Sequence, residues 1–519
     1  MLKKIPLDLY ELKDFIGGDF LYIDKTEYLA RLLGMGKLFF LSRPRRFGKS
    51  LMISTLNELF RGNKELFKDT WIGQEGRYDF PVHPVIRLDF SALNWKTPEL
   101  LEVSLLNYLV AISQAYGVDI VTSDSISALQ SLIYKLSERG HVVLLVDEYD
   151  SPIIHHLTDL NIAEEMRVFL SNFYTTIKGA LGLFHFVMIT GVSKFAKTSI
   201  FSAFNNVIDL TMNPIVDAVC GLTQEELEGH YMPYIESLAE QDGMTVEQTL
   251  AKMKQWYNGY RFSMESQVKV YNPFSVHHCL AAKKFRNYWF ASGTPTLLVK
   301  LLQKYYPSVT ALNHAWVPFK AFDAFSLTGL PFMTLLYQTG YLTLEDIDEK
   351  EKKYQLMYPN DEVSEAFTEY LLDNVIDPMT TLDSRYRDEL VSALQRDDVD
   401  GFCMVVNGIL ARVPYMLHMD KEGYYHTVIY IMLLVAGFHC ESEQVISTGR
   451  VDMVLDTPGH KYLFEFKFNQ TAEAALAQIK ERSYYQRYQA EGKALVLIGM
   501  NIDGQTRKVS FVRERHSAH

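Results

Sequence analysis

The sequence has little of what marks secreted, membrane-embedded or disulfide-bonded proteins. It contains four cysteines in 519 residues and no CxxC pair, which excludes a zinc ribbon or a disulfide scaffold. The longest apolar runs, residues 184–192 and 427–438, are too short to span a bilayer. The first residues lack the apolar stretch of a signal peptide. We therefore expect a cytoplasmic protein without membrane association, with reduced thiols at Cys220, Cys279, Cys403 and Cys440.

An excess of positive charge is also absent. The formal net charge is −12, which argues against nucleic-acid affinity over the whole chain. From Lys461 to the last residue, however, ten Lys and Arg stand against six Asp and Glu. This local surplus predicts either a phosphate-contacting surface or an ordinary exterior of mixed charge. Its main members are Lys480, Arg482, Arg487, Arg507, Lys508, Arg513 and Arg515.

No repeats or low-complexity tracts are present, so length is the best guide to domain number. A chain of 519 residues predicts two to four domains, and 48% hydrophobic residues suffice for packed cores. The strand and helix patterns predict an α/β protein in three parts, at residues 1–213, 214–359 and 360–519. Assembly into a homo-oligomer is left open by the sequence.

The most informative pattern is a hairpin that carries two acids. Residues 451–456 and 461–468 are apolar strands interrupted by Asp452, Glu465 and Lys467, and residues 457–460 have turn chemistry. If those four residues form the turn, Asp456 faces Lys461 and Asp452 faces Glu465. Facing side chains lie about 5 Å apart, so the acids repel one another unless a divalent cation lies between them. Lys467 shares their face, next to the position of a metal-bound water.

An alternating strand with Glu and Lys on one side is more often a plain solvated face, and this is the alternative reading. The following residues favour the first reading, with a helix predicted over 472–488 and a strand over 494–499. The whole segment resembles the PD-(D/E)xK nuclease superfamily, whose core is helix, three strands, helix, strand, although no proline precedes Asp452. The resemblance implies that Asp452 and Glu465 bind metal and that Lys467 is catalytic. It further implies an accessory acid and a Q…Y element, matched by Glu443, Gln478 and Tyr484 or Tyr485.

A second motif lies near the N-terminus. Residues 38–42 form an apolar strand, a tight loop follows, and Gly48-Lys49-Ser50 opens a helical pattern. This is a phosphate-binding P-loop, in which Lys49 reaches the β- and γ-phosphates of ATP and the Ser50 hydroxyl ligates Mg²⁺. Arg43 occupies the position where the usual motif has its first glycine. The predicted nucleotide-binding residues of the loop are Arg45, Arg46, Phe47, Gly48, Lys49 and Ser50.

Two acids supply the expected partner of this loop. Residues 141–146 form a continuously apolar strand, as in a buried parallel sheet, and Asp147 and Glu148 follow it. Asp147 is predicted to hold Mg²⁺, and Glu148 to orient and deprotonate the hydrolytic water. Alone, Asp-Glu after a strand is often an exposed loop start. Strands are also predicted at 85–89, 186–190 and 206–211, with Thr190 or Ser193 as a polar sensor of nucleotide or as an ordinary loop hydroxyl.

Residues 1–213 resemble the AAA-ATPase-like family of P-loop proteins. The resemblance rests on the segments at residues 22–26, 43–50, 146–150 and 191–195. Many members of that family carry a C-terminal PD-(D/E)xK domain, so the two motifs support one another. The implied fold is a mostly parallel P-loop sheet followed by a restriction-endonuclease-like α/β domain.

The region between the two motifs lacks catalytic signals. Thr223 and Glu226 form a capping box, a helix is expected over 244–256, and a short hairpin over 260–263 and 268–271. Strands are expected at 335–344 and 354–359, and helical residues from 362 to 410. A helical lid or a small winged-helix module is the assignment that follows.

These patterns together predict an ATP-hydrolysing protein with a Mg²⁺-dependent nuclease domain that cleaves DNA, where Mn²⁺ could replace Mg²⁺. ATP binding would gate the nuclease. The alternative is a nucleotide-dependent switch or scaffold whose nuclease-like domain binds nucleic acid or a protein without cutting it.

Overall fold

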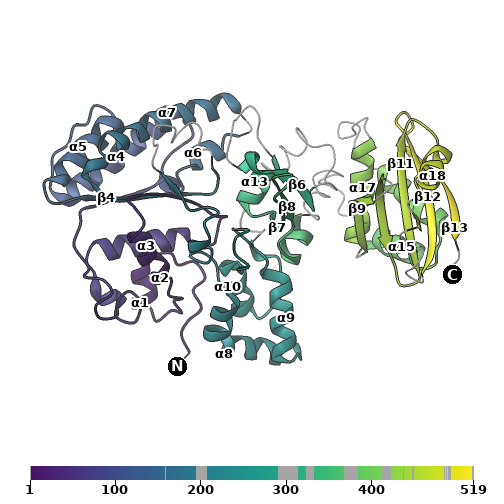
Figure 1. The fold of residues 1–519 in the computed structure, drawn as a ribbon, viewed down its shortest axis with the longest axis horizontal. Coiled ribbons are helices and arrows are strands. Elements are labelled where there is room, and N and C mark those ends of the chain that lie inside the picture. The colour runs from purple at the N-terminus through teal and green to yellow at the C-terminus, as the bar shows by residue number, and fades with distance from the viewer. Residues whose placement is uncertain are drawn as a thin grey trace. The chain divides into compact units, whose positions relative to one another are not determined.

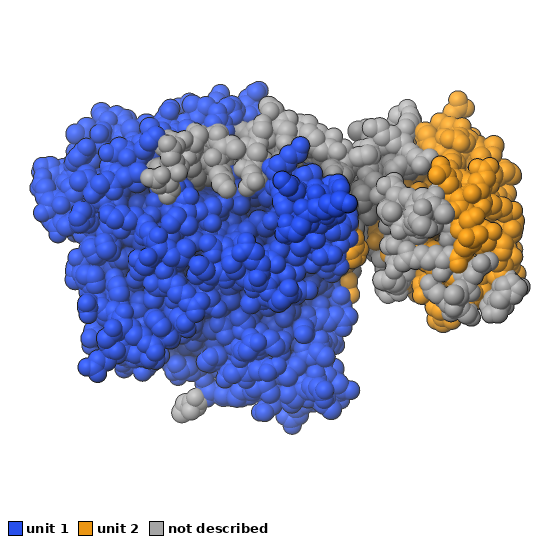
Figure 2. All heavy atoms as spheres, viewed as in Figure 1, with its two compact units in different colours: residues 1–297, 316–363 blue, residues 298–315, 364–519 orange. Residues whose placement is uncertain are grey.

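The computed structural model of the chain divides into two compact units, one of residues 1–297 and 316–363 and the other of residues 298–315 and 364–519 (Figure 2). Each unit is described by itself. The described residues are 2–157, 159–194, 207–289, 312, 314–322, 332–367, 384–411, 422–436, 438–446, 449–483, 485–486, 488 and 493–516.

The first unit is built on a parallel sheet with strand order β2-β3-β4-β1-β5. Its strands are β1 (Leu38–Ser42), β2 (Val85–Asp89), β3 (Val142–Asp147), β4 (Phe184–Gly191) and β5 (Ile208–Asp209). Every residue of β1 and β3 is buried, which explains why these strands read as unbroken apolar runs. The predicted parallel P-loop sheet is confirmed. Of the strand expected at 206–211, Asn206 lies outside the described residues and only Ile208–Asp209 is a strand.

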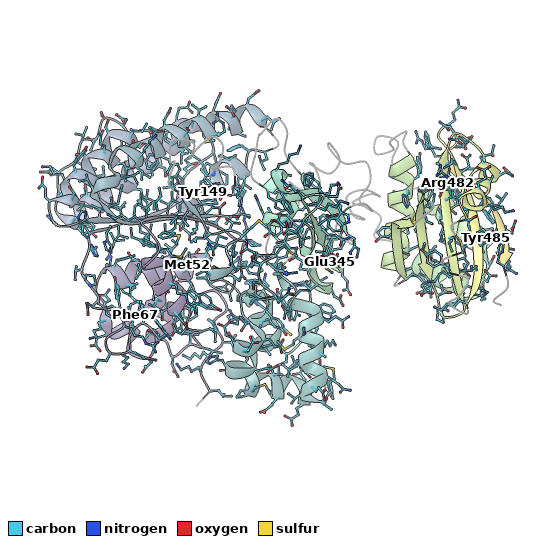
Figure 3. All side chains as sticks on the ribbon, viewed as in Figure 1. Met52, Phe67, Tyr149, Glu345, Arg482 and Tyr485 are labelled. Atoms are coloured by element: carbon cyan, nitrogen blue, oxygen red, sulfur yellow. The ribbon has the colours of Figure 1, made fainter. Side chains whose placement is uncertain are left out.

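Helices cover both faces of this sheet. Figure 1 shows α4, α5 and α7 on one side and α1, α2 and α3 on the other. Their bounds are α1 (Leu12–Gly17), α2 (Thr26–Leu33), α3 (Lys49–Phe60), α4 (Pro98–Tyr116), α5 (Ser125–Ser137) and α7 (Leu160–Gly179), and the short α6 (Ser151–Ile154) follows β3. Side chains fill the space between α3 and the sheet, where Met52 lies (Figure 3). Because α3 starts at the end of β1 and α6 starts just after β3, the loop and the two acids meet at one edge.

The rest of the first unit joins a helical cluster to a small sheet. The helices α8 (Gln224–Asp242), α9 (Val246–Tyr257) and α10 (Pro273–Ala282) pack around a common core that includes Tyr231, Ile235 and Tyr257. The predicted capping box at Thr223 and Glu226 is present. The sheet has the order β6-β8-β7, and α13 (Phe332–Thr339) precedes β7 along the chain. The strands are β6 (Ala315–Pro318), β7 (Thr343–Asp348) and β8 (Lys353–Met357).

Two expectations for this region were wrong. The strand expected at 335–344 is the end of α13, a turn at Gly340 and the start of β7. Gly340 has φ +91°, a conformation that stops the helix and that glycine adopts readily. The expected hairpin at 260–271 is reduced to a single bridge between Tyr260 and Val270, because Tyr271 pairs with Leu222 instead.

The second unit holds a mixed sheet with the order β13-β12-β11-β10-β9. Its elements are α15 (Ser384–Gln395), α16 (Val399–Leu410), α17 (Glu422–Val435), β9 (His439–Ile446), β10 (Gly449–Asp456), β11 (His460–Phe468), α18 (Ala472–Glu481), β12 (Ala494–Asp503) and β13 (Lys508–His516). From α17 to β12 this is the predicted order of helix, three strands, helix and strand. The strand β13 extends the sheet beyond that prediction.

Both faces of this sheet are covered, because alternate residues of β11 meet different helices. Leu463 belongs to the apolar cluster that contains Ile479 of α18. Phe464 contacts Phe402 of α16, and Phe466 contacts His426 of α17. The helix predicted to run to residue 488 ends at Glu481, because Ser483 adopts a left-handed φ of +53°. Among the described residues, no helix is both long and apolar enough to cross a membrane.

Candidate nucleotide and metal sites

The loop between β1 and α3 places Lys49 in a buried position. Gly48 is the N-cap of α3 and has φ +98°, which a side chain would not adopt without strain. The Lys49 ammonium donates to the carbonyl oxygens of Arg43 and Pro44 at 3.0 Å each. It also lies 3.7 Å from Oε1 of Glu148. The helix N-terminus and the ammonium together form a site that favours phosphate.

Arg43 has a structural role that its position in the motif does not suggest. Its buried guanidinium donates to the carbonyl oxygens of Thr211 at 2.7 Å and Val216 at 3.3 Å. It also lies 4.1 Å from the ring centroid of Phe262. The side chain therefore ties the loop to the segment after β5. Phe47 also holds the loop in place, because its ring packs against Tyr260 and Phe262.

The Asp147 carboxylate at the end of β3 and the Ser50 hydroxyl at the start of α3 lie side by side. The Thr190 hydroxyl donates to Oδ1 of Asp147 at 2.6 Å, and the Ser50 hydroxyl is a second hydrogen-bond partner of this carboxylate. Burial raises the pKa of Asp147, and the neighbouring Glu148 charge adds to the effect. A divalent cation would offset that cost. A carboxylate and a hydroxyl at a helix N-terminus fit the oxygen preference of Mg²⁺.

Glu148 is the second of the two acids at the end of β3. It has φ +53°, a left-handed backbone conformation that is uncommon outside glycine and concentrates at functional sites. Its Oε2 accepts from the Ser151 hydroxyl at 3.3 Å, and its Oε1 faces Lys49. The side chain lines the cavity described below.

The structure separates the two sensor candidates. Ser193 is fully buried, and both its hydroxyl and its N–H donate to Oδ2 of Asp150 at 2.6 Å. Burial raises the pKa of Asp150 to about 6. Thr190 instead contacts Asp147. The geometry therefore favours Thr190 over Ser193 as the sensor of bound nucleotide. The hydrogen bonds of Ser193 instead fix the Asp150 carboxylate.

A cavity of about 710 Å³ opens beside the loop. Its lining includes Arg45–Ser50, Asp89 and Glu148, together with mostly apolar groups from distant segments. The size and this mixed lining suit a nucleoside triphosphate. Sequence reasoning missed the part of the lining that comes from distant segments, which includes Leu9, Tyr22, Lys25, Leu222, Phe274 and His277. Of these residues, Tyr22 and Lys25 lie within a stretch that the resemblance had drawn on, and the Lys25 ammonium pairs with Glu226 at 2.6 Å.

His277 joins three segments in the wall of this cavity. The Tyr231 hydroxyl donates to Nε2 of His277 at 2.7 Å, and the other ring nitrogen donates to the Pro6 carbonyl. Burial lowers the pKa of His277 to about 4, so the ring is neutral at pH 7. Helices α8 and α10 and the N-terminal segment are thereby held together around the cavity.

This arrangement predicts a loss of stability in acid. Between pH 6.5 and pH 4, His277 is protonated in the unfolded chain but stays neutral in the folded protein. Protonation therefore stabilises the unfolded state, and the free energy of unfolding falls as the pH drops. The loss amounts to at most about 3 kcal/mol. Urea denaturation between pH 7.5 and pH 4.5 measures it. His277→Gln should flatten the pH dependence, whereas His230→Gln, at an exposed position of α8, should not. An unchanged slope in His277→Gln would contradict the prediction.

The register of the second unit's hairpin is the one predicted. Met453 pairs with Phe464, Leu455 with Tyr462 and Asp456 with Lys461. The same register, continued by one residue, places Asp452 opposite Glu465. On the other side of β10, Val451 pairs with Gln444 and Met453 with Ser442, which places Glu443 opposite Asp452. Three acids therefore stand in one row across β9, β10 and β11, although the side chain of Glu443 lies outside the described residues.

Glu465 is 1% exposed, which is inconsistent with a plain solvated face. Its Oε1 accepts from the Lys467 ammonium at 3.2 Å and from the Gln478 amide of α18. Asp452 accepts from the Phe466 N–H at 2.8 Å. The buried carboxylate is therefore fixed by a lysine of its own strand and by an amide of the following helix.

These residues suit a hard divalent cation. Asp452 and Glu465 offer carboxylate oxygens, and cation binding would relieve the repulsion between facing acids. The described side chains form no group of three or more His, Cys, Asp or Glu able to hold a metal. Glu443 occupies the register position that would complete such a group. Tyr484 lies outside the described residues. Tyr485, labelled in Figure 3, stacks on His516 of β13, with 4.9 Å between the ring centroids.

Three of the basic residues near the C-terminus lie in ion pairs. Lys480 forms an ion pair with Glu514, and Arg515 with Asp397. Arg513 lies 3.8 Å from Asp400. Arg487 lies outside the described residues. Of the two readings of this surface, the pairs favour an exterior of mixed charge.

Comparison with known proteins agrees with this architecture. Residues 6–201 match a family described as a predicted AAA-ATPase, and residues 420–512 match the PD-(D/E)XK nuclease superfamily. The chain therefore belongs to the proteins that join an AAA-ATPase-like domain to a C-terminal PD-(D/E)XK domain. It is 34% identical, over 99% of both chains, to a protein of Azotobacter chroococcum mcd 1 described as an uncharacterized protein in the vnfD 5′ region. No solved structure matches the chain.

Proposed function

We propose that this protein binds and hydrolyses Mg²⁺–ATP in its first unit and cleaves DNA in its second unit. The observation that carries the nuclease proposal is the facing pair Asp452 and Glu465, with Lys467 hydrogen-bonded beside them. The two family matches support the pairing of these activities in one chain. The cytoplasm is the proposed location, since the four cysteines are free and buried.

In the first unit each residue has a distinct task. Lys49 and the N–H groups of the loop bind the β- and γ-phosphates. Ser50 and Asp147 would hold Mg²⁺, which would supply positive charge to the transferred phosphoryl group. Glu148, which lines the cavity, orients and deprotonates the attacking water. The base contacts the apolar part of the lining, which includes Phe274 and His277.

In the second unit Asp452 and Glu465 would hold the metal, for which Mn²⁺ can replace Mg²⁺. When bound, the cation would supply positive charge beside the phosphate and lower the pKa of a bound water. Lys467 would position that water. Gln478 keeps the Glu465 carboxylate in place through its amide, as partners of metal-binding carboxylates commonly do. Glu443 completes the acidic row.

ATP binding is proposed to gate DNA cleavage, a coupling motivated by the fusion of the two domains. Glu148→Gln tests it. The substitution should leave ATP binding intact and slow hydrolysis about 100-fold, because the amide cannot accept the proton. Phosphate release measures hydrolysis, and a fluorescent ATP analogue measures binding. If binding is the gate, Glu148→Gln should still cut DNA when ATP is added.

Glu138→Gln, at an exposed position after α5, is the matched control and should behave as the unaltered protein. DNA cleavage that is the same with and without ATP would remove the gating proposal. Normal hydrolysis by Glu148→Gln would remove the role of Glu148.

A switch or scaffold is the second candidate function. The paired state of Lys480, Arg513 and Arg515 favours it, because these residues have little unopposed charge for a phosphate backbone. Metal titration with labelled DNA separates the two functions. Loss of intact DNA on addition of Mg²⁺ or Mn²⁺ supports the nuclease, and binding of DNA or protein without turnover supports the scaffold.

A further inference from the structure

Two hydrogen bonds connect the phosphate-binding loop to the point where the chain leaves the first unit. The Trp289 indole N–H donates to the carbonyl oxygen of Arg45 at 3.1 Å. The backbone N–H of Trp289 donates to Oε1 of Glu362 at 2.7 Å. Glu362 is followed by Val363, the last residue of the first unit. A residue of the loop is thus joined through one tryptophan to a residue more than 300 positions later.

Packing leaves Trp289 little freedom. Its side chain is buried, and its ring centroid lies 5.2 Å from that of Tyr341. A Cβ at Gly340 would come within 2.8 Å of Pro44 and 3.3 Å of the Trp289 ring, so this turn, the loop and the indole are in direct contact. Close-packed groups pass a displacement on to their neighbours instead of absorbing it. A shift of the loop therefore moves Trp289.

The other end of the link is equally well held. Glu362 is fully buried, and its Oε2 accepts from the Ser275 hydroxyl of α10 at 2.7 Å. Burial raises the pKa of Glu362 to about 7. Asn360 donates to the Asn258 carbonyl at 2.7 Å and accepts from the Val363 N–H at 3.1 Å, which caps the helical residues 361–367. The segment thus has a defined position that Trp289 helps to set.

Arg45 is well placed to respond to phosphate. Its carbonyl shares a rigid peptide plane with the N–H of Arg46, a residue of the cavity wall with φ +69°. When that N–H turns towards a phosphate, the Arg45 carbonyl must turn with it. The hydrogen bond from Trp289 then follows the carbonyl or breaks, so nucleotide biases the position of Trp289.

We propose that Trp289 is a positioning residue for the phosphate-binding loop, and that with Glu362 it passes the nucleotide-dependent movement of the loop to residues 359–363. The inference rests on the proposed ATP binding and deepens the proposed gating. It names the route by which the ATP site acts on the segment that leads to the nuclease domain.

Hydrogen–deuterium exchange on the full chain, with and without Mg²⁺–ATP, tests the link. In the unaltered protein ATP should slow exchange at residues 43–50 and change it at residues 359–363. Trp289→Phe keeps a ring but removes the donor, so the loop should still respond while residues 359–363 do not. It should also raise KM for ATP about five- to tenfold with kcat nearly unchanged. Trp316→Phe, at an exposed position of β6, is the control and should match the unaltered protein.

A second pair of variants tests the far end. Glu362→Gln keeps an acceptor for the Trp289 N–H and should retain the response at residues 359–363, whereas Glu362→Ala should lose it. If ATP leaves residues 43–50 unchanged in the unaltered protein, ATP binding at this loop fails and the link fails with it. If the loop responds but residues 359–363 do not, or respond equally in Trp289→Phe, the link is overturned while ATP binding stands.

Discussion

Replacing Lys49 with methionine is expected to lower kcat/KM for ATP hydrolysis about 1000-fold. Charged donors aimed at a transferring phosphoryl group are among the largest single contributions to catalysis. The ammonium is buried, lies at the start of α3 and is 3.7 Å from Oε1 of Glu148. Methionine keeps the aliphatic stem and its packing but contributes no charge to the phosphates. Phosphate release over a range of ATP concentrations measures the change.

Two comparisons make this result decisive. Lys68→Met, at an exposed position of the same unit, should hydrolyse ATP like the unaltered protein. Thermal unfolding of Lys49→Met shows whether the fold survives, since two carbonyl groups lose their donor. A folded Lys49→Met protein with undiminished hydrolysis would show that the loop is not the ATP site.

The elements predicted correctly from the sequence are those whose structure one local feature determines. The hairpin register follows from a four-residue turn, because strand pairing is counted outward from it and a one-residue slip would turn every side chain to the other face. The buried strands β1 and β3 are apolar throughout and lead directly into motif residues. The residues of such segments are compatible with only one secondary structure.

The segments whose secondary structure was predicted wrongly have sequences that are compatible with two structures. Residues 335–339 contain Tyr and Thr, which favour a strand, yet they form the end of α13, where almost all of them are buried. The end of α18 at Glu481 coincides with a left-handed Ser483, for which the sequence gives no glycine signal.

Parts of the candidate sites could not be predicted because they depend on contacts between distant segments. In the sequence, Arg43 departs from the P-loop motif. In the structure, its guanidinium donates hydrogen bonds to backbone carbonyl groups about 170 residues further along the chain. His277 and Trp289 are ordinary aromatic residues in sequence, and only the fold brings them to the cavity and the loop. Local motifs name the residues that contact phosphate or metal, while the residues that position them come from topology.

Replacing Asp452 with asparagine is expected to reduce metal-dependent DNA cleavage about 1000-fold. The loss corresponds to roughly 4 kcal/mol of transition-state stabilisation, a reasonable value for removing one charged metal ligand. Asparagine has the same shape and can still accept from the Phe466 N–H, so the hairpin should remain folded. What it lacks is the negative charge opposite Glu465. Cleavage of labelled DNA at several Mg²⁺ and Mn²⁺ concentrations measures activity, and calorimetry measures metal affinity.

Asp456→Asn is the matched control, because Asp456 lies on the same strand four residues away and on the same face. It pairs with Lys493 at 2.5 Å and stands outside the acidic row, so its loss should leave cleavage within about twofold of the unaltered protein. If Asp452→Asn binds Mg²⁺ and cuts DNA as the control does, the facing acids are not the metal site. If neither the unaltered protein nor the control cuts DNA while both bind metal, the scaffold replaces the nuclease, since the facing carboxylates would then hold a cation without directing a water at phosphorus.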